Sequence, residues 1–268
     1  MRENLTPLPA IREGGSLSPP RVRGGAGGEV DSDATLGRPS YVWGFGQERR
    51  YRLMLPRLAA EPSPVLDIGC GVGVYVSRFA RDGASAFGIE YDSPKLGEAV
   101  GGGLRVAHAA AEALPFAGDT FGTVLLHEVI EHFTDDAAAL AEALRVTRPG
   151  GRVVIFSPNR LYPFETHGVY IGRRYVFGNI PLVGYLPGVL RRRLCPHVRA
   201  YTVGDIRRLL APLPCRTLLH VQIFAGYDKM FRRWPLLARL VRNATYLAER
   251  TPLRVFGLSH FVVLEKLS

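Results

Sequence analysis

The chain has 268 residues, of which 47% are hydrophobic and 22% charged, and its net charge is +10. This composition predicts a soluble globular protein with one catalytic-size domain and an insertion or cap. Three scattered cysteines are too few for a disulfide framework or a Cys-x-x-Cys zinc site, so we expect a reducing, cytoplasmic compartment.

The N-terminal segment has the composition of a disordered tail. Residues 1–40 hold seven glycines and five prolines and few apolar side chains. They lack the apolar segment of a signal peptide. The longest uncharged run, residues 175–190, is too short and too interrupted by glycine and proline to span a membrane. Order is expected to begin near the aromatic residues 41–45, followed by a helix over 46–60.

Short apolar runs then alternate with helical patterns. Strands are predicted at 64–69, 84–90, 103–107, 121–126, 152–157, 217–224 and 259–266. Helices are predicted at 72–81, 93–100, 135–147, 201–210 and 235–250. In the last helix, the apolar residues follow a helical period and form one stripe: Leu237, Leu240, Val241, Ala244, Leu247 and Ala248.

This rhythm predicts an α/β fold with a parallel sheet covered by helices on both faces. The predicted domain covers residues 41–268. Two segments fall outside its repeated units, at about 159–200 and 228–256, and we expect them to form cap insertions over the site.

A glycine-rich turn is the strongest functional signal. A buried strand leads into Asp67-Ile-Gly69-Cys70-Gly71-Val-Gly73, where missing β-carbons let the backbone approach a ligand and a helix N-terminus offers free N–H groups. The next strand ends at Glu90, where an acid can accept both hydrogens of a ribose diol. Together these features predict an adenosine-type cofactor.

These residues resemble the first two motifs of class I S-adenosylmethionine-dependent methyltransferases. Segments 111–116, 128–132 and 148–151 resemble later motifs of that family, including the ubiquinone-pathway O-methyltransferases. The resemblance implies a Rossmann-like, seven-stranded, mostly parallel sheet with helices on both faces and an antiparallel last strand. It also implies S-adenosyl-L-methionine as cofactor. It implies a cofactor site of Asp67, Gly69, Cys70, Gly71, Gly73, Glu90, Tyr91, Ala111, Glu112 and His127.

One position departs from the family pattern. Ala110 stands where the family commonly has an aspartate that faces the adenine amine. We therefore expect that contact either to come from the backbone near Ala111 and Glu112 or to be absent.

His127 follows the fourth strand, at the sheet edge where open α/β folds bind ligands. Histidine titrates near neutrality and suits the removal of a proton from a hydroxyl acceptor. His127 is therefore the first candidate catalytic base, and His167 in the insertion is the second. The acceptor is expected to be a small or lipid-linked molecule methylated on oxygen.

The segment Glu128-Val-Ile-Glu131-His132 resembles the metal site of ubiquinone-pathway O-methyltransferases and of small-RNA 2′-O-methyltransferases. That resemblance implies a Mg²⁺ site of Glu128, Glu131 and His132. The other interpretation is a structural anchor beside the cofactor, and the sequence leaves both open.

Residues 158–268 carry 18 basic and five acidic side chains, whereas residues 41–157 carry 11 and 14. The basic half is expected to cap the site, to contact an anionic membrane surface at the inner face as a peripheral protein, or both. A nucleic-acid partner is not expected. Two alternatives stay open: an RNA 2′-O-methyltransferase, and a non-catalytic membrane-associated scaffold with a residual cofactor fold.

Overall fold

The computed structural model describes residues 43–59 and 63–268. The predicted disordered tail, 1–40, lies outside the described residues. Of the aromatic residues expected at the start of the ordered chain, Trp43 packs its ring edge against Tyr51 and Tyr75, at centroid distances of 5.8 and 5.2 Å.

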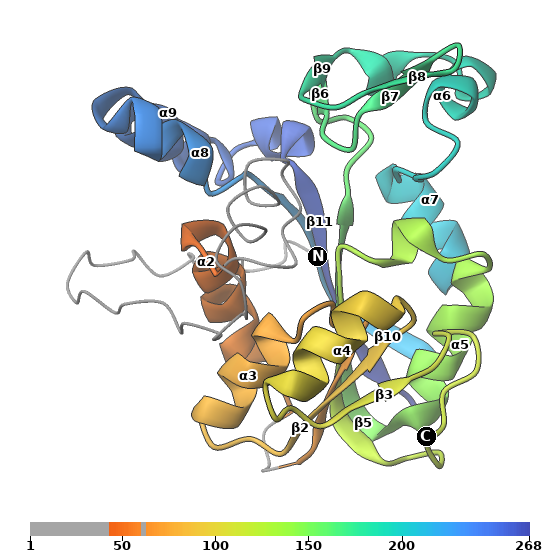
Figure 1. Cartoon of the computed structure of the whole chain (residues 1–268). Coiled ribbons are helices and arrows are strands. Elements are labelled where there is room, and N and C mark those ends of the chain that lie inside the picture. The colour runs from red at the N-terminus through yellow and green to blue at the C-terminus, as the bar shows by residue number, and fades with distance from the viewer. Residues whose placement is uncertain (1–42, 60–62) are drawn as a thin grey trace.

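A seven-stranded sheet forms the centre of the molecule (Figure 1). Its strands in chain order are β1 (Val65–Ile68), β2 (Ala86–Glu90), β3 (Val106–His108), β4 (Phe121–His127), β5 (Thr147–Pro158), β10 (Cys215–Ile223) and β11 (Ser259–Lys266). Their order across the sheet is β10-β11-β5-β4-β1-β2-β3. β11 is antiparallel to both of its neighbours, while the pairs among β1 to β5 are parallel. The predicted fold class is confirmed.

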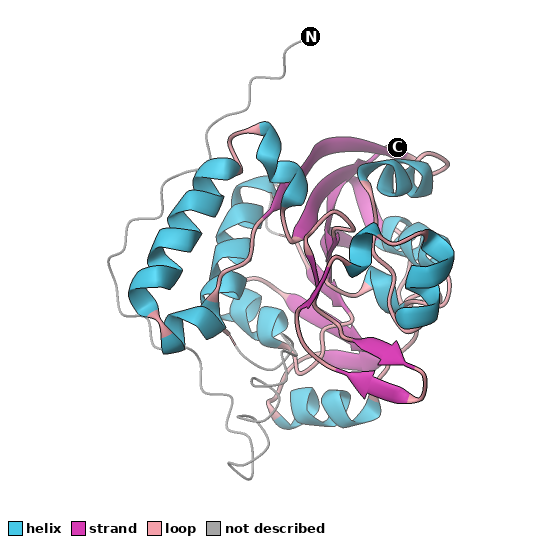
Figure 2. Cartoon of the chain, turned by 90° about the horizontal axis from the view of Figure 1, so that it is seen from above, coloured by secondary structure: helices cyan, strands magenta, loops and turns pink. Residues whose placement is uncertain are grey.

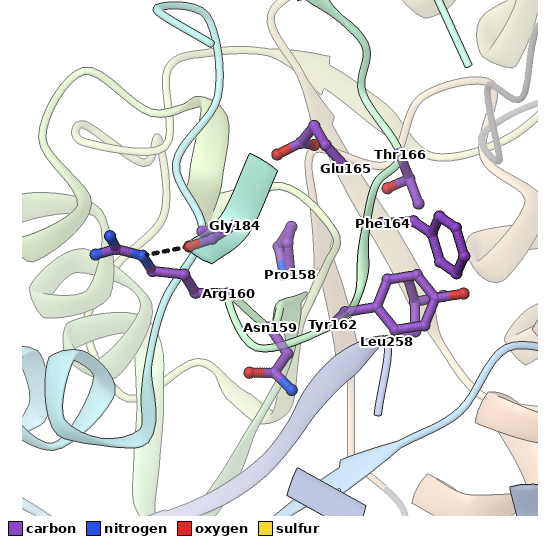
Figure 3. A pocket seen from close by; sticks show the side chains of 10 residues that line it. Pro158, Asn159, Arg160, Tyr162, Phe164, Glu165, Thr166, Gly184 and Leu258 are labelled. Carbon is purple, nitrogen blue, oxygen red and sulfur yellow. Dashed lines mark hydrogen bonds between the residues drawn. The ribbon is translucent and has the colours of Figure 1, made fainter. Parts of the chain in front are cut away.

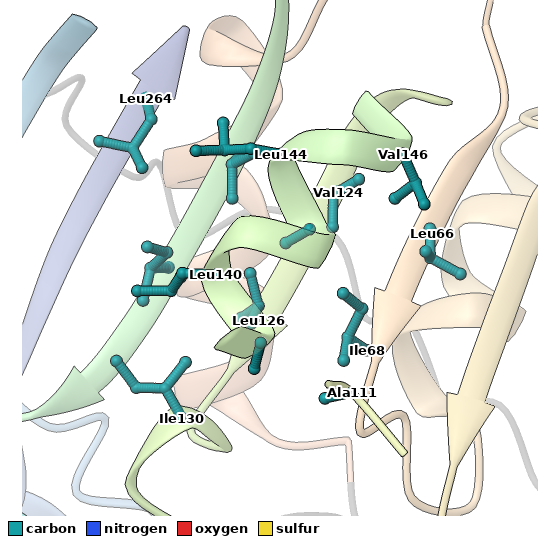
Figure 4. Packing of buried hydrophobic residues seen from close by; sticks show 14 of the residues in the cluster. Leu66, Ile68, Ala111, Val124, Leu126, Ile130, Leu140, Leu144, Val146 and Leu264 are labelled. Atoms are coloured by element: carbon teal, nitrogen blue, oxygen red, sulfur yellow. The ribbon is translucent and has the colours of Figure 1, made fainter. Parts of the chain in front are cut away.

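Helices cover both faces of this sheet (Figure 2). They are α2 (Phe45–Met54), α3 (Val74–Arg81), α4 (Ser93–Gly101), α5 (Asp136–Val146) and α7 (Val203–Leu210). α2 and α3 pack their buried side chains on one face, and α5 and α7 pack theirs on the other. Figure 4 shows Leu140 and Leu144 of α5 packed over side chains of β1 and β4.

β5 is longer than predicted, because the glycine turn after α5 belongs to the strand. A β-carbon on Gly151 would lie 2.8 Å from the Arg148 carbonyl oxygen, so the turn needs glycine there. The prediction treated this turn as a boundary between helix and strand. Across it, the pairing of β4 with β5 shifts register, from Phe121 opposite Thr147 to Thr123 opposite Arg152.

The first insertion leaves the carboxyl end of β5 and returns at α7. It contains β6 (Phe164–Glu165), β7 (Val169–Ile171), β8 (Arg174–Val176), β9 (Ile180–Pro181) and α6 (Gly188–Leu194), with a small core of its own. The second insertion connects β10 to β11 through α8 (Asp228–Arg233) and α9 (Pro235–Ala248). Figure 1 shows both insertions above the sheet, at the end where the glycine turn lies.

Helix α9 bears on the two interpretations of the basic half, because a cap would bury its apolar stripe and a membrane contact would leave the stripe outward. Leu237, Leu240 and Leu247 are exposed, whereas Ala238 and Arg242 are buried. Among the helices of the described residues, none has the length and apolar character needed to cross a membrane.

Candidate functional site

The turn after β1 has the backbone that its glycines predict. Gly69, Gly71 and Gly73 have φ angles of 71°, 58° and 81°, a region that side chains with a β-carbon rarely adopt. A β-carbon on Gly69 would lie 2.3 Å from Cγ2 of Val129, which follows β4. The turn therefore brings the loops after β1 and β4 into close contact before α3 begins.

Glu90 lies at the tip of β2 with its carboxylate held by three backbone N–H groups. One oxygen accepts from Gly71 at 2.8 Å, and the other accepts from Tyr91 at 2.9 Å and from Asp92 at 2.8 Å. A carboxylate has about four acceptor positions, so one position is left for a further hydrogen bond, on the oxygen that accepts from Gly71. The predicted ribose acceptor is thus fixed between the tips of the first two strands.

Two side chains at this turn, those of Asp67 and Cys70, are buried. Burial, and then the nearby Glu90 carboxylate, raise the pKa of Asp67 well above its usual value. Burial also raises the pKa of the Cys70 thiol, whose sulfur lies 3.7 Å from the Gly71 carbonyl oxygen. Cys70 is a buried packing residue of the turn with the character of an unreactive thiol.

The expected adenine region lies beyond Glu90. The Tyr91 ring is 71% exposed and stacks on His108, with centroids 5.6 Å apart. Ala111 is buried in the core beside this edge. The side chain of Glu112 turns away to accept from the backbone N–H groups of Thr134 and Asp135, so its backbone alone is available toward the adenine side.

His127 ends β4 among aromatic rings. Its Nε2 lies 3.1 Å from the Tyr75 hydroxyl, and its ring centroid lies 4.6 Å from that of Tyr75 and 5.3 Å from that of Phe156. Burial, and then the positive charge of Arg50, lower the pKa of His127 well below its usual value. The imidazole is therefore uncharged at neutral pH.

Glu128 is directed away from the other predicted metal ligands. Its Oε1 lies 3.2 Å from Nη2 of Arg50 and accepts from the Ser259 hydroxyl. Its backbone has a φ of 51°, an unusual conformation for a residue other than glycine. The structure therefore does not bring Glu128 together with Glu131 and His132, as the predicted metal site required.

His167 takes the place of Glu128 in the observed cluster. One potential ligand atom from each of Glu131, His132 and His167 lies within 4.8 Å of the others. Nε2 of both histidines is 4.0 Å from Oε1 of Glu131. Both carboxylate oxygens of Glu131 are buried without a hydrogen-bond partner. Such an arrangement is costly unless something binds there.

The charges around this cluster favour neutral imidazole. Burial, and then His167, lower the pKa of His132 to about 4. Burial, and then Glu128, raise the pKa of Glu131 well above its usual value. The cluster thus combines uncharged imidazole at His132 with a buried carboxyl group that would gain from a nearby cation.

A buried ion pair orients His167. Glu165 contacts Nδ1 of His167 at 3.1 Å, and Arg191 donates to the other oxygen of Glu165 at 2.8 Å. Burial alone would raise the pKa of Glu165, but the hydrogen bonds from His167 and the charge of Arg191 outweigh it and lower the pKa to about 2. This carboxylate leaves Nε2 of His167 facing Glu131.

A small pocket opens at the carboxyl end of β5 (Figure 3). Pro158, Asn159, Tyr162, Phe164 and Glu165 are among its lining residues, so the first insertion and the end of β5 build it together. Ser157 is fully buried and is not among the residues that line this pocket.

Sequence reasoning missed several residues that shape the site. Arg50 comes from α2 and Ser259 from β11, and no local pattern connects either of them with Glu128. Glu165 lies two residues before His167, and that spacing is the one signal that could have found it. The pairing of His167 with Glu131 and His132 depends on the path of the insertion.

Part of this chain is similar in sequence to known proteins. Residues 66–155 match a family described as a methyltransferase domain. A ubiquinone biosynthesis O-methyltransferase of Sinorhizobium medicae is 36% identical over 122 residues, which are 43% of this chain and 47% of that protein. An uncharacterized methyltransferase of a Mycobacterium species is 37% identical over 115 residues, 41% of this chain and 46% of that protein. The aligned part thus spans about half the length of these curated relatives.

Solved structures share the fold over more of the chain. An S-adenosylmethionine-dependent methyltransferase from Mesorhizobium loti superposes with a TM-score of 0.56, covering 83% of this chain and 98% of its own at 17% identity. The [4+2]-cyclase SpnF superposes with a TM-score of 0.55, covering 86% and 84% at 17% identity. The fold is therefore shared by proteins that are named for different reactions.

Proposed function

We propose that this chain, whose residues 66–155 match a methyltransferase domain, is an S-adenosylmethionine-dependent enzyme that methylates an oxygen of a small-molecule or lipid-linked acceptor. The oxygen acceptor is suggested by relatives named ubiquinone biosynthesis O-methyltransferase, of which the chain matches about half. A cytoplasmic location with peripheral association at the inner membrane face is part of the proposal.

The position of Glu90 carries this proposal. Its carboxylate is held by three backbone N–H groups at the tips of β1 and β2, beside a turn whose glycines have positive φ angles. A carboxylate fixed in advance can accept from a ribose hydroxyl without the entropy loss of ordering a flexible side chain. These residues fit S-adenosyl-L-methionine: the turn would hold its methionine end and Glu90 its ribose.

The bound cofactor supplies a methyl group on a positively charged sulfur, so the protein needs mainly to align the acceptor and take its proton. His127 is uncharged at neutral pH, as a base must be, and the Tyr75 hydroxyl fixes its ring. His167 has the second geometry suited to a base, because Glu165 on Nδ1 leaves Nε2 directed into the site. We propose His127 as the acceptor-side base, with His167 as the alternative.

Calorimetry with S-adenosylhomocysteine and its 2′-deoxy analogue tests the cofactor assignment. Glu90→Ala should weaken binding of the parent ligand by about 10- to 100-fold, the value of hydrogen bonds to a charged group. The 2′-deoxy ligand should bind the wild type more weakly, and Glu90→Ala should weaken its binding less than that of the parent ligand, because only its 3′-hydroxyl can still contact Glu90. Glu265→Gln, at the far end of the sheet, is the control. Equal losses for both ligands would mean that Glu90 only supports the turn.

A metal centre at Glu131, His132 and His167 is a second part of the proposal. The two unpartnered buried oxygens of Glu131 favour it. Two imidazoles and one carboxylate do not fit Mg²⁺, which prefers oxygen ligands, but they suit a divalent transition metal such as Zn²⁺, Mn²⁺ or Co²⁺. Such an ion would act as a Lewis acid toward the acceptor oxygen.

Visible absorption during Co²⁺ titration tests the metal centre independently of activity. The wild type should develop ligand-field bands, and His167→Ala should abolish them. His197→Ala is the matched control, because His197 lies in the same insertion and contacts the His167 carbonyl without joining the cluster. Bands that survive His167→Ala, or that never appear, would reject the site.

Labelled methyl transfer separates the acceptor classes. The protein is incubated with methyl-labelled cofactor and, in separate reactions, a lipid extract, a small-molecule fraction or total RNA. We expect label in the lipid extract or in the small-molecule fraction. Label in RNA would favour 2′-O-methylation of RNA instead. Cofactor binding without transfer to any fraction would favour the non-catalytic scaffold.

A further inference from the structure

Helix α9 presents its apolar side to solvent. Leu236, Leu240 and Leu247 are 79%, 68% and 64% exposed. Their spacing of four and seven residues places them in one stripe along the helix. Trp234, immediately before the helix, is also exposed. Asn243, which is also exposed, lies between Leu240 and Leu247 on this side. Large exposed apolar side chains gathered on one side of a helix mark an interaction surface.

The opposite side of α9 fixes this orientation. The Arg242 guanidinium lies 4.3 Å from the ring centroid of Phe45 and 4.3 Å from that of Phe231. Ala238 is fully buried on the same side. Rotating the helix to bury its leucines would expose these contacts and bring Arg239 inward, so the exposure of the stripe follows from the packing.

The charge around the stripe is positive. Residues 228–256 contain seven basic and two acidic side chains. The two acids are engaged within the molecule: Asp228 accepts from the Phe45 and Gly46 backbones, and Glu249 pairs with Arg49 at 2.5 Å. Arg239 and Arg250 are exposed, and each follows a leucine of the stripe by three residues. These two arginines therefore lie along one edge of the stripe.

The topology places α9 at the functional edge of the sheet. β10 is parallel to β5, because each is antiparallel to β11 between them. The segment that follows β10 therefore leaves the same edge as the glycine turn and the first insertion. Figure 1 shows α8, α9 and the first insertion on that side of the molecule.

We propose that the exposed face of α9, defined by Trp234, Leu236, Leu240 and Leu247 with Arg239 and Arg250, docks the protein on an anionic lipid bilayer. Leucines that enter the acyl boundary with arginines and an aromatic ring at headgroup depth are the pattern of an interfacial helix. A second copy of the chain fits this face poorly, since a two-fold contact would bring the same arginines of both copies together. This inference rests on the peripheral membrane association proposed above and names its surface, but it does not depend on the methyl transfer.

Vesicle flotation of the full chain is the direct test. The protein should float with phosphatidylcholine vesicles that contain phosphatidylglycerol, and it should bind pure phosphatidylcholine far less. Binding should fall as salt concentration rises, because the arginine contribution is screened. Failure to bind the anionic vesicles would overturn the proposal.

Paired variants locate the surface. Leu236→Asp/Leu240→Asp should lower the partition coefficient by about tenfold or more. Arg239→Gln/Arg250→Gln should remove most of the salt dependence. Val100→Asp/Leu267→Asp changes two exposed apolar residues away from α9 and should bind as the wild type does.

Two further measurements keep the result specific. Thermal melting and calorimetric binding of S-adenosylhomocysteine should be the same for all these variants, which separates a lost membrane surface from a lost fold or cofactor site. Light scattering should show that Leu240→Asp leaves the mass unchanged. A wild-type dimer that dissociates on Leu240→Asp would overturn the lipid assignment. Equal vesicle binding by the Leu236→Asp/Leu240→Asp variant and the Val100→Asp/Leu267→Asp control would overturn it as well.

Discussion

The guanidinium of Arg50 lies 3.2 Å from the carboxylate of Glu128, and it also donates to the Ser259 hydroxyl at 3.0 Å. Through these contacts, α2 is fastened to the carboxyl end of β4 and to the start of β11. Arg50 and Glu128 have side chains that are only 10% and 14% exposed. The pair is thus a buried junction between three elements that are far apart in the sequence.

Removing one partner of this junction should be costly. Arg50→Met would leave the Glu128 carboxylate buried without its cation, and we expect a loss of about 3 kcal/mol or more in the free energy of unfolding. Urea denaturation measures it. Arg52→Met on the same helix breaks an exposed pair with Glu48 and should cost less than about 1 kcal/mol. Similar losses for both variants would show that the junction contributes little.

Two glycine-to-alanine substitutions should have opposite effects. Gly69→Ala places a β-carbon 2.3 Å from Val129 at a φ of 71°, and it should cost about 2 kcal/mol and weaken cofactor binding. Gly97 lies inside α4 with nothing within 4 Å of an added β-carbon. Gly97→Ala should therefore stabilise the protein by up to about 1 kcal/mol. Thermal melting of both variants decides this.

Asn159 ties the end of β5 to the segment before β11. Its amide donates to the carbonyl oxygens of Val255 at 2.8 Å and Gly257 at 2.7 Å, and its Oδ1 accepts from Leu161 N–H. Asn159→Asp would replace the donor with an acceptor facing two carbonyls, which should cost about 1–3 kcal/mol. Asn243→Asp, on the exposed side of α9, should change stability by less than about 0.5 kcal/mol in denaturation experiments.

Protonation of His220 should lower the stability of the folded protein in mild acid. Burial, and then the neighbouring His260, lower its pKa from 6.5 to about 4. The folded state therefore resists protonation that the unfolded chain accepts, so the contribution of His220 is complete above about pH 6.5 and declines as pH falls toward 4. His220→Gln should flatten the stability profile in that window. An NMR titration that gives an ordinary pKa for His220 would contradict this expectation.

The regular part of the fold was predictable because its signals are local. Apolar runs such as residues 64–69 and 121–126 gave their strands to within a residue or two, and the reversal of the strand at 259–266 came with the family resemblance. The short strands and α6 of the first insertion were not predicted. Their residues are held by packing around Val169, Val183 and Cys195 rather than by a periodic pattern.

The candidate site divides in the same way. Gly69, Gly71 and Glu90 could be assigned because their roles follow from backbone geometry at strand ends. The exchange of Glu128 for His167 in the metal cluster could not be foreseen, since it depends on Arg50 capturing Glu128 and on Glu165 with Arg191 orienting His167. The outward side of α9 also escaped the sequence pattern, because a helical stripe does not state which way it faces.

The place of β11 between β5 and β10 has a consequence for protein synthesis. Residues 259–266 are translated after the other six strands, yet they pair with strands on both sides. Until they leave the ribosome, the backbone edge of β5 stays open and β10 has no partner in the sheet. The nascent chain therefore passes through a stage at which a chaperone, or a premature contact with another polypeptide, can compete for those two edges.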